Sequence, residues 1–170
     1  LRVGPVTDIP FPTELIIREH GITYKVNIQT GHKTGYYLDQ RSNRLLARHL
    51  AQGKDVLDCF CYTGGFSLNA WAGNARSIIA VDESAEALEI FRENLRLNQL
   101  ISDGISLVRG DVFQLLRGYR DSGKTFDMII LDPPKFAPTT AQVERAARGY
   151  KDINLLAMKL LREDGILLSF

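Results

Sequence analysis

Residues 56–66 read VLDCFCYTGGF, and this stretch decides the expected fold. An apolar run stops abruptly at an acid, Asp58, and two adjacent glycines follow. Buried parallel strands that end at a ligand crevice have this pattern, because the carboxyl end of such a strand leads into the loop that meets the ligand. Residues 131–136 read LDPPKF, so a second apolar run ends at an acid, Asp132, and two prolines follow it. We therefore expect two strands whose carboxyl ends border one crevice.

Strand and helix patterns alternate on both sides of these stretches. Short apolar runs predict strands at residues 55–60, 77–81, 105–108, 126–131 and 166–170. Helical spacing predicts helices at residues 39–52, 65–72, 85–98, 112–120 and 140–161. Strands that alternate with helices through short loops favour an α/β fold with a doubly wound parallel sheet.

Polar residues mark the starts of three of these helices. The expected caps are Asp39, Ser84 and Asp111. In the helix that follows Asp39, the expected buried face consists of Leu45, Leu46 and Leu50.

The N-terminal part has a different pattern. Residues 14–29 alternate like strands around a His20-Gly21 turn signal, which predicts a β-hairpin. We expect residues 1–38 to form a hairpin and connector extension, and residues 39–170 to form the α/β domain. The sequence starts without methionine and stops inside an expected strand, so we expect a domain that is truncated at its C-terminus.

The composition narrows the class of protein. A chain of 170 residues with 45% hydrophobic content can bury one core, and a net charge of +1 gives no global signal for nucleic acid. Two cysteines cannot build a disulfide framework, and no Cys/His cluster suits a metal. No apolar run approaches the roughly 20 residues that span a bilayer. We expect a cytoplasmic protein with reduced thiols, no metal and no membrane association.

Residues that suit a nucleoside-type cofactor follow three successive strands. Gly64 and Gly65 open a helix, where glycine lets a ligand approach the backbone, although an ordinary turn has the same pattern. Asp82 ends the next strand and could accept hydrogen bonds from ribose hydroxyls, or serve only as a helix-terminal charge. Asp111 ends the third and could face an adenine amino group. With Asp58, these acids together favour a cofactor.

NAD and S-adenosylmethionine are the two candidates for this cofactor. The Gly-x-Gly-x-x-Gly spacing that brings a backbone to a pyrophosphate is absent. S-adenosylmethionine has no pyrophosphate, so the shorter glycine pair suffices. We expect S-adenosylmethionine.

The second stretch is expected to face the substrate. Pro133 and Pro134 fix φ and hold the Asp132 carboxylate toward the crevice, where a planar base would meet it. The alternative is that two prolines simply end a strand. Cys59 and Cys61 have no neighbour that lowers their pKa, so small hydrophobic packing is favoured over nucleophilic catalysis. These observations together favour an enzyme that methylates a base.

Residues 32–49 combine basic and aromatic side chains. The members are Lys33, Tyr36, Tyr37, Arg41, Arg44 and Arg48. Such a mixture suits a phosphate backbone and stacked, unpaired bases. A solvated helix face explains it equally well, so both interpretations stay open.

Four motifs follow one another along the chain: GHKTGYYLDQR at residues 31–41, DCFCYTGGF at 58–66, DPPKF at 132–136 and RGYKDIN at 148–154. Their order and spacing resemble the RlmI-type methyltransferases of large-subunit (23S) ribosomal RNA, which methylate cytosine C5 with S-adenosylmethionine. The resemblance covers essentially the whole chain and implies a class I, Rossmann-like methyltransferase fold with ribosomal RNA as partner. Family members are longer and carry an N-terminal PUA RNA-binding domain.

The resemblance also implies roles for individual residues. In the family, a cysteine that attacks cytosine C6 follows the strand that matches residues 166–170, so the nucleophile is expected beyond Phe170. Asp132 would act as a catalytic residue at the cytosine edge. The expected cofactor-binding residues are Asp58, Phe60, Tyr62, Thr63, Gly64, Gly65, Asp82, Asp111 and Asp132. The expected RNA-binding residues are Lys33, Tyr36, Tyr37, Arg41, Pro133, Pro134 and Lys135.

Two alternatives remain. A related RNA methyltransferase would act on guanine or on another base atom, and an RNA-binding module would keep cofactor affinity without catalysis. The methylated nucleotide and the oligomeric state, a homodimer included, stay open.

Overall fold

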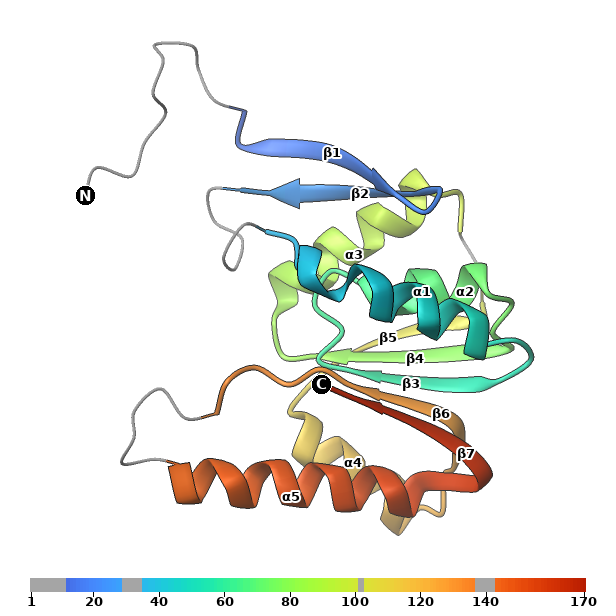
Figure 1. Cartoon of the computed structure of the whole chain (residues 1–170), viewed down its shortest axis with the longest axis vertical. Coiled ribbons are helices and arrows are strands. Elements are labelled where there is room, and N and C mark those ends of the chain that lie inside the picture. The colour runs from blue at the N-terminus through green and yellow to red at the C-terminus, as the bar shows by residue number, and fades with distance from the viewer. Residues whose placement is uncertain (1–11, 29–34, 101–102, 137–142) are drawn as a thin grey trace.

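The computed structural model describes residues 12–28, 35–100, 103–136 and 143–170 (Figure 1). Its strands are β1 (Glu14–Glu19), β2 (Ile22–Asn27), β3 (Asp55–Cys59), β4 (Ser77–Asp82), β5 (Ile105–Arg109), β6 (Phe126–Leu131) and β7 (Leu161–Ser169). Its helices are α1 (Arg41–Leu50), α2 (Gly65–Ala72), α3 (Ala85–Leu97), α4 (Val112–Asp121) and α5 (Val143–Leu160), with a 3-10 turn η1 at Leu38–Gln40. None of these described helices is long and apolar enough to cross a membrane.

Five parallel strands form the central sheet in the order β5-β4-β3-β6-β7. From β3 the chain passes through β4 to β5, which forms one edge of the sheet. It then returns to β6, on the other side of β3, and continues to β7 at the other edge. Helices α1, α2 and α3 lie on one face, and α4 and α5 lie on the other (Figure 1). The predicted doubly wound α/β fold is confirmed. Its switch point lies between β3 and β6, where the carboxyl ends of parallel strands leave room for a ligand.

Each face of the sheet has its own hydrophobic cluster. On the first face, Ile78 and Met128 pack with Leu68 and Phe91 from the helices. On the second, Leu57 and Ile129 pack with side chains that include Ile153. Strands that are buried on both faces read as continuous apolar runs, which is the pattern of the quoted stretches.

The predicted hairpin is confirmed as β1 paired antiparallel with β2. Its turn uses His20 and Gly21, both with positive φ. Ile22, Tyr24 and Val26 alternate inward along β2 and belong to the cluster on the first sheet face. The hairpin therefore shares a core with the α/β part, and the division of the chain at residue 38 stays a prediction.

Helix caps are partly as expected. The side chain of Ser84 accepts a hydrogen bond from the backbone N–H of Ala87, and that of Asp111 accepts one from Gln114. The predicted cap at Asp39 is wrong, because Asp39 lies in η1 and α1 begins only at Arg41. The turn η1 occupies the residues that would have formed the first helical turn.

The buried face of α1 also differs from the prediction. Leu46 is 45% exposed, whereas Arg44 is only 3% exposed. The helix turns Arg44 toward the hairpin because a buried carboxylate, Glu19, binds it there. A rule that places leucine inside and arginine outside cannot anticipate that partner.

Candidate functional site

The loop after β3 has an unusual backbone. Phe60, Tyr62 and Gly64 all have positive φ, at 62°, 49° and 87°. This conformation is uncommon for residues other than glycine, and strain of this kind concentrates at functional sites. The N–H of Cys61 donates to the carbonyl of Val81 at 3.0 Å, so the loop is tied to β4 as it leaves the sheet.

Gly64 is required by packing. A Cβ at this position would lie 2.3 Å from the ring of Phe91, which is completely buried in α3. The positive φ of Gly64 adds a second reason for glycine. Gly64 therefore allows the loop to lie directly on α3 before α2 begins at Gly65.

Asp82 holds the same loop from the neighbouring strand. Because Cys59 pairs with Val81 of β4, Asp82 follows at the level where the loop starts. Its two carboxylate oxygens accept hydrogen bonds from the backbone N–H of Tyr62 at 2.8 Å and of Ser84 at 2.9 Å. A carboxylate has about four acceptor positions, so Asp82 retains capacity for ligand hydroxyls.

Asp58 is a completely buried carboxyl group. The hydroxyl of Ser67 donates to Oδ2 at 2.5 Å, while Oδ1 is buried with no hydrogen-bond partner among the described residues. Burial raises the pKa of Asp58 to about 7, and the charges of Asp132 and Asp82 add to the rise. The hydrogen bond from Ser67 lowers the pKa but does not outweigh burial. A buried acceptor oxygen without a donor is uncommon in folded proteins, and it marks the end of β3 as a place where a polar group is kept for a reason other than packing.

Asp132 follows β6 on the other side of β3, since Cys59 also pairs with Leu131. The side-chain amide of Gln40 donates to Asp132 Oδ1 at 3.2 Å, and that of Asn43 donates to Gln40 at 2.6 Å. The start of α1 is thereby joined to the end of β6. Gln40 belongs to the first of the four motifs, but its position in the sequence did not indicate a contact with Asp132.

Two tyrosines lie beside this carboxylate. The rings of Tyr37 and Tyr62 meet edge to face at 5.9 Å. Burial raises the pKa of Tyr37, and the charges of Asp132 and Asp39 raise it further. Tyr37, Tyr62 and Asp132 therefore come together at one place on the carboxyl edge, although they come from three separate segments.

The Pro133-Pro134 loop is held from α5. The hydroxyl of Tyr150 donates to the carbonyl of Pro134 and accepts from the N–H of Phe136, both at 3.2 Å. The rings of Phe136 and Tyr150 lie 4.5 Å apart, and the Phe60 ring lies 6.3 Å from Phe136. Tyr150 belongs to one of the four motifs, but its position in the sequence indicated no role.

The basic segment is largely structural. Arg44 forms two hydrogen bonds with Glu19, at 2.7 and 2.9 Å, and donates to the carbonyl of Tyr37. Arg48 donates to the carbonyl of His20 and to Asn69. These bonds join α1 to the hairpin and to α2. They favour neither a solvated nor an RNA-binding face for Arg44 and Arg48.

Tyr36 is also part of this junction. It is 6% exposed, its hydroxyl donates to Glu19 at 3.0 Å, and the Arg44 guanidinium lies 4.4 Å from its ring centre. This position does not fit stacking on an RNA base. The sequence could not show it, because the partner Glu19 lies in another element. Lys33 lies outside the described residues.

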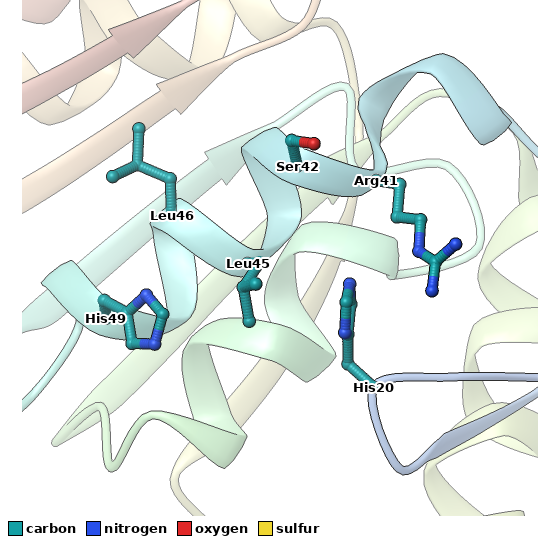
Figure 2. Close-up of a pocket in the computed structure, with 6 residues that line it drawn as sticks. All are labelled: His20, Arg41, Ser42, Leu45, Leu46 and His49. Atoms are coloured by element: carbon teal, nitrogen blue, oxygen red, sulfur yellow. The ribbon is translucent and has the colours of Figure 1, made fainter.

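Arg41 is exposed and lies at one end of a groove between α1 and the hairpin turn. Figure 2 shows His20 rising from that turn toward α1, with Arg41 beside it. The residues that line the groove are His20, Arg41, Ser42, Leu45, Leu46 and His49. No acidic side chain is among them, so the groove is compatible with an anionic partner. It is distinct from the carboxyl edge that holds Asp58, Asp82 and Asp132.

Both cysteines are buried and free. Burial raises the pKa of both thiols well above the usual range, with a further rise from the charge of Asp58. A buried thiol with a raised pKa is a poor nucleophile, which agrees with their expected packing role. No group of three or more metal-ligating side chains occurs within the described part of the chain.

Comparison with known proteins places the chain in a family. A family model for S-adenosylmethionine-dependent methyltransferases matches residues 7–169. Ribosomal RNA large subunit methyltransferase I of Escherichia coli (strain K12) is 54% identical over 170 residues, which are 100% of this chain and 43% of that protein. The chain thus spans less than half the length of this relative.

Solved structures agree with this placement. SMU.776, assigned as a methyltransferase and solved in complex with SAH, is 33% identical with a TM-score of 0.81, over 92% of this chain and 41% of that one. A SAM-dependent methyltransferase from Agrobacterium tumefaciens gives a TM-score of 0.80 at 21% identity, over 94% of this chain and 53% of that one, which is a likeness of fold. The expected cofactor is confirmed at the level of the family. The chain belongs to the S-adenosylmethionine-dependent methyltransferases.

Proposed function

We propose that the protein containing this chain transfers a methyl group from S-adenosylmethionine to C5 of a cytosine in large-subunit (23S) ribosomal RNA. The observation that supports this most strongly is the 54% identity, over all 170 residues, to a relative named for large-subunit ribosomal RNA methylation. The choice of cytosine and of its C5 atom comes from the four motifs. A cytoplasmic location follows from this substrate and is part of the proposal.

The cofactor is proposed to lie along the carboxyl edge of β3, β4 and β5. Its ribose would bind Asp82, its adenine would lie near Asp111, and its amino-acid end would lie over residues 58–65. S-adenosylmethionine supplies an electrophilic methyl group when bound. The remaining acceptor positions of Asp82 and the strained loop backbone between Phe60 and Gly64 support this placement. Phe60, Tyr62, Thr63, Gly64 and Gly65 would form the wall under it.

The target base is proposed to enter between Asp132 and Tyr37. The exocyclic amine of a cytosine can donate a hydrogen bond to a carboxylate oxygen. The Gln40 amide would orient the Asp132 carboxylate for this contact, since it donates to Oδ1. The tight Pro133-Pro134 loop, held by Tyr150, would limit how far the base can move.

The RNA chain is proposed to continue over the adjoining surface. The residues retained for this surface are Tyr37, Arg41, Pro133, Pro134 and Lys135. Lys33 stays a prediction, and Tyr36 is left out because its ring is buried. The groove that begins at Arg41 would extend the surface along α1 (Figure 2).

The nucleophile is proposed to be a cysteine that follows the strand matching residues 166–170, as the resemblance implies. Cys59 and Cys61 are poor candidates because both are buried, Cys59 at the end of β3 and Cys61 within the loop that follows. In the full-length protein, Cys59→Ala and Cys61→Ala should each still trap a covalent adduct with RNA that contains 5-fluorocytosine. Loss of the adduct in either folded variant would assign the nucleophile to that cysteine instead.

The deciding experiment is methyl transfer by the full-length protein to unmodified 23S ribosomal RNA with a tritiated donor. The labelled nucleoside is then identified by chromatography. We expect 5-methylcytidine, and Asp132→Ala should abolish most of the label. Label in another nucleoside would favour the related RNA methyltransferase. RNA binding without any label would favour the non-catalytic module.

A further inference from the structure

A helix, α3, covers the edge of β2 that does not pair with β1. Asn98, which caps the C-terminus of α3, accepts from the N–H of Thr23 at 2.8 Å and donates to the carbonyl of Thr23 at 2.7 Å. Asn94, one turn earlier, accepts from the N–H of Lys25 at 2.7 Å. The two side-chain amides thus take the place of a neighbouring strand along β2, beside which α3 runs (Figure 1).

Asn94 also reaches in the opposite direction. Its amide nitrogen donates to the carbonyl of Thr63 at 2.9 Å, so one side chain joins β2 to the loop after β3. Asn94 is completely buried and Thr63 is 4% exposed. The bond is therefore shielded from water, and its loss would remove a donor from a buried carbonyl.

The same side of α3 supports the next residue of the loop. Phe91, three residues before Asn94, packs against Gly64 so closely that no Cβ fits between them. Thr63 and Gly64 are consequently both fixed by α3. Among the described residues, the side chain of Asn98 forms hydrogen bonds with Thr23 of β2 and with the carbonyl of Asn94, and none of these bonds reaches the loop.

We propose that Asn94 is a positioning residue that couples the hairpin to the cofactor loop. By holding the Thr63 carbonyl, it keeps the strained backbone between Phe60 and Gly64 in the shape that binds the amino-acid end of the cofactor. Because its other end holds β2, the position of the hairpin then sets cofactor affinity. This inference rests on the proposed placement of the cofactor over residues 58–65.

The test compares Asn94→Ala with Asn98→Ala in the full-length protein, by calorimetric titration with S-adenosylhomocysteine. Both variants lose bonds to β2, but only Asn94→Ala loses the bond to the loop. Loss of one buried hydrogen bond at the loop should raise Kd about tenfold in Asn94→Ala, with less than about a twofold change in Asn98→Ala. The KM for S-adenosylmethionine should rise in parallel with Kd, while the KM for RNA stays constant.

A second variant keeps the test decisive if Asn94→Ala does not fold. Asn94→Asp keeps an acceptor for Lys25 but has no amide donor for Thr63, and it should weaken cofactor binding at neutral pH in the same way. Amide hydrogen exchange should also quicken at Tyr62 and Gly64 in the Asn94 variants and not in Asn98→Ala. Equal Kd values in wild type and both Asn94 variants would overturn the inference. If Asp82→Ala also binds normally, the proposed cofactor placement itself is wrong.

Discussion

Both ends of the central sheet carry aspartates, but the two ends differ in the groups that bind these carboxylates. At the amino ends of β3 and β6, Asp55 and Asp127 are each paired with Arg76 and Arg162, at N–O distances of 2.5 to 2.9 Å. At the carboxyl ends, Asp58 and Asp82 accept only from neutral donors, a hydroxyl and two backbone N–H groups. No salt bridge to Asp58 or Asp82 occurs among the described residues.

The pKa directions follow from this difference. Hydrogen bonds from Arg76 hold the pKa of Asp55 well below its usual range. For Asp127, burial raises the pKa, but the N–H of Asp55 and the two arginines outweigh it and the pKa is lowered. Burial raises that of Asp58. The acids at the amino ends are thus satisfied by arginines, while at the carboxyl ends Asp82 keeps acceptor positions for a ligand.

The largest expected effect concerns Asp58. Its carboxyl keeps a proton between the ordinary value of 3.8 and its own pKa of about 7, whereas the unfolded chain releases that proton. The free energy of unfolding should therefore fall as pH rises through this window, by roughly 4 kcal/mol, and level off above it. Asp58→Asn cannot ionise and should remove the slope. Thermal unfolding of the full-length protein at about pH 5 and about pH 8 samples roughly 2.7 kcal/mol of this change, and an equal slope in wild type and Asp58→Asn would contradict the raised pKa.

The next effect concerns Asp82. Asp82→Ala removes up to two charge-assisted bonds to the ribose and should weaken binding of S-adenosylhomocysteine by roughly 2–4 kcal/mol. The anchor for the Tyr62 N–H is lost as well. Asp82→Asn keeps one acceptor oxygen, so its affinity for S-adenosylhomocysteine should lie between those of wild type and Asp82→Ala. Calorimetry that finds equal affinity in wild type and Asp82→Ala would remove Asp82 from the cofactor site.

A smaller effect is expected at the substrate side of the same edge. Tyr150→Phe removes the two hydroxyl bonds to the Pro133-Pro134 loop but keeps the ring against Phe136. The KM for RNA should rise about threefold, which corresponds to roughly 0.7 kcal/mol, and the KM for S-adenosylmethionine should not change. Tyr119→Phe on α4 serves as the control. A rise in both KM values would point to a general loss of structure.

The smallest effect belongs to the paired end. Because the pKa values of Asp55 and Asp127 are lowered by folding, their ion pairs add stability above about pH 4 and lose it as the pH falls through the lowered values. Arg76→Ala with Arg162→Ala should slightly lower the unfolding temperature at neutral pH and leave cofactor affinity unchanged. Acid titration of the unfolding temperature checks this. A change in cofactor Kd would mean that the two ends are not independent.

The fold was predictable because its signals are local. Apolar runs, glycines and cap residues such as Ser84 lie next to the elements they define, and the structure confirms the strands they marked. The acids at the carboxyl edge were predictable for the same reason, since each lies within the last residues of a strand or shortly after it. Their shared position then results from parallel register, in which Cys59 pairs with both Val81 and Leu131.

The residues that were missed depend on partners far away in the sequence. Arg44 looks like a surface residue until Glu19 is placed beside it. Gln40 and Tyr150 gain their roles from Asp132 and Pro134, on other elements. Asn94 looks like a neutral helix residue and is the link between two segments. Spacing along one helix carries no information about such partners.

The amide cover over β2 has a consequence for the order of folding. The hairpin itself needs only contacts between near neighbours, so it can form within microseconds. Its attachment through Thr23 and Asn98 joins residues that are 75 positions apart, and α3 must already be in place. Closing so long a loop carries an entropic cost that must be met before the bonds contribute. We therefore expect the hairpin to dock late, after the sheet has assembled, and the cofactor loop to reach its final shape only in that last step.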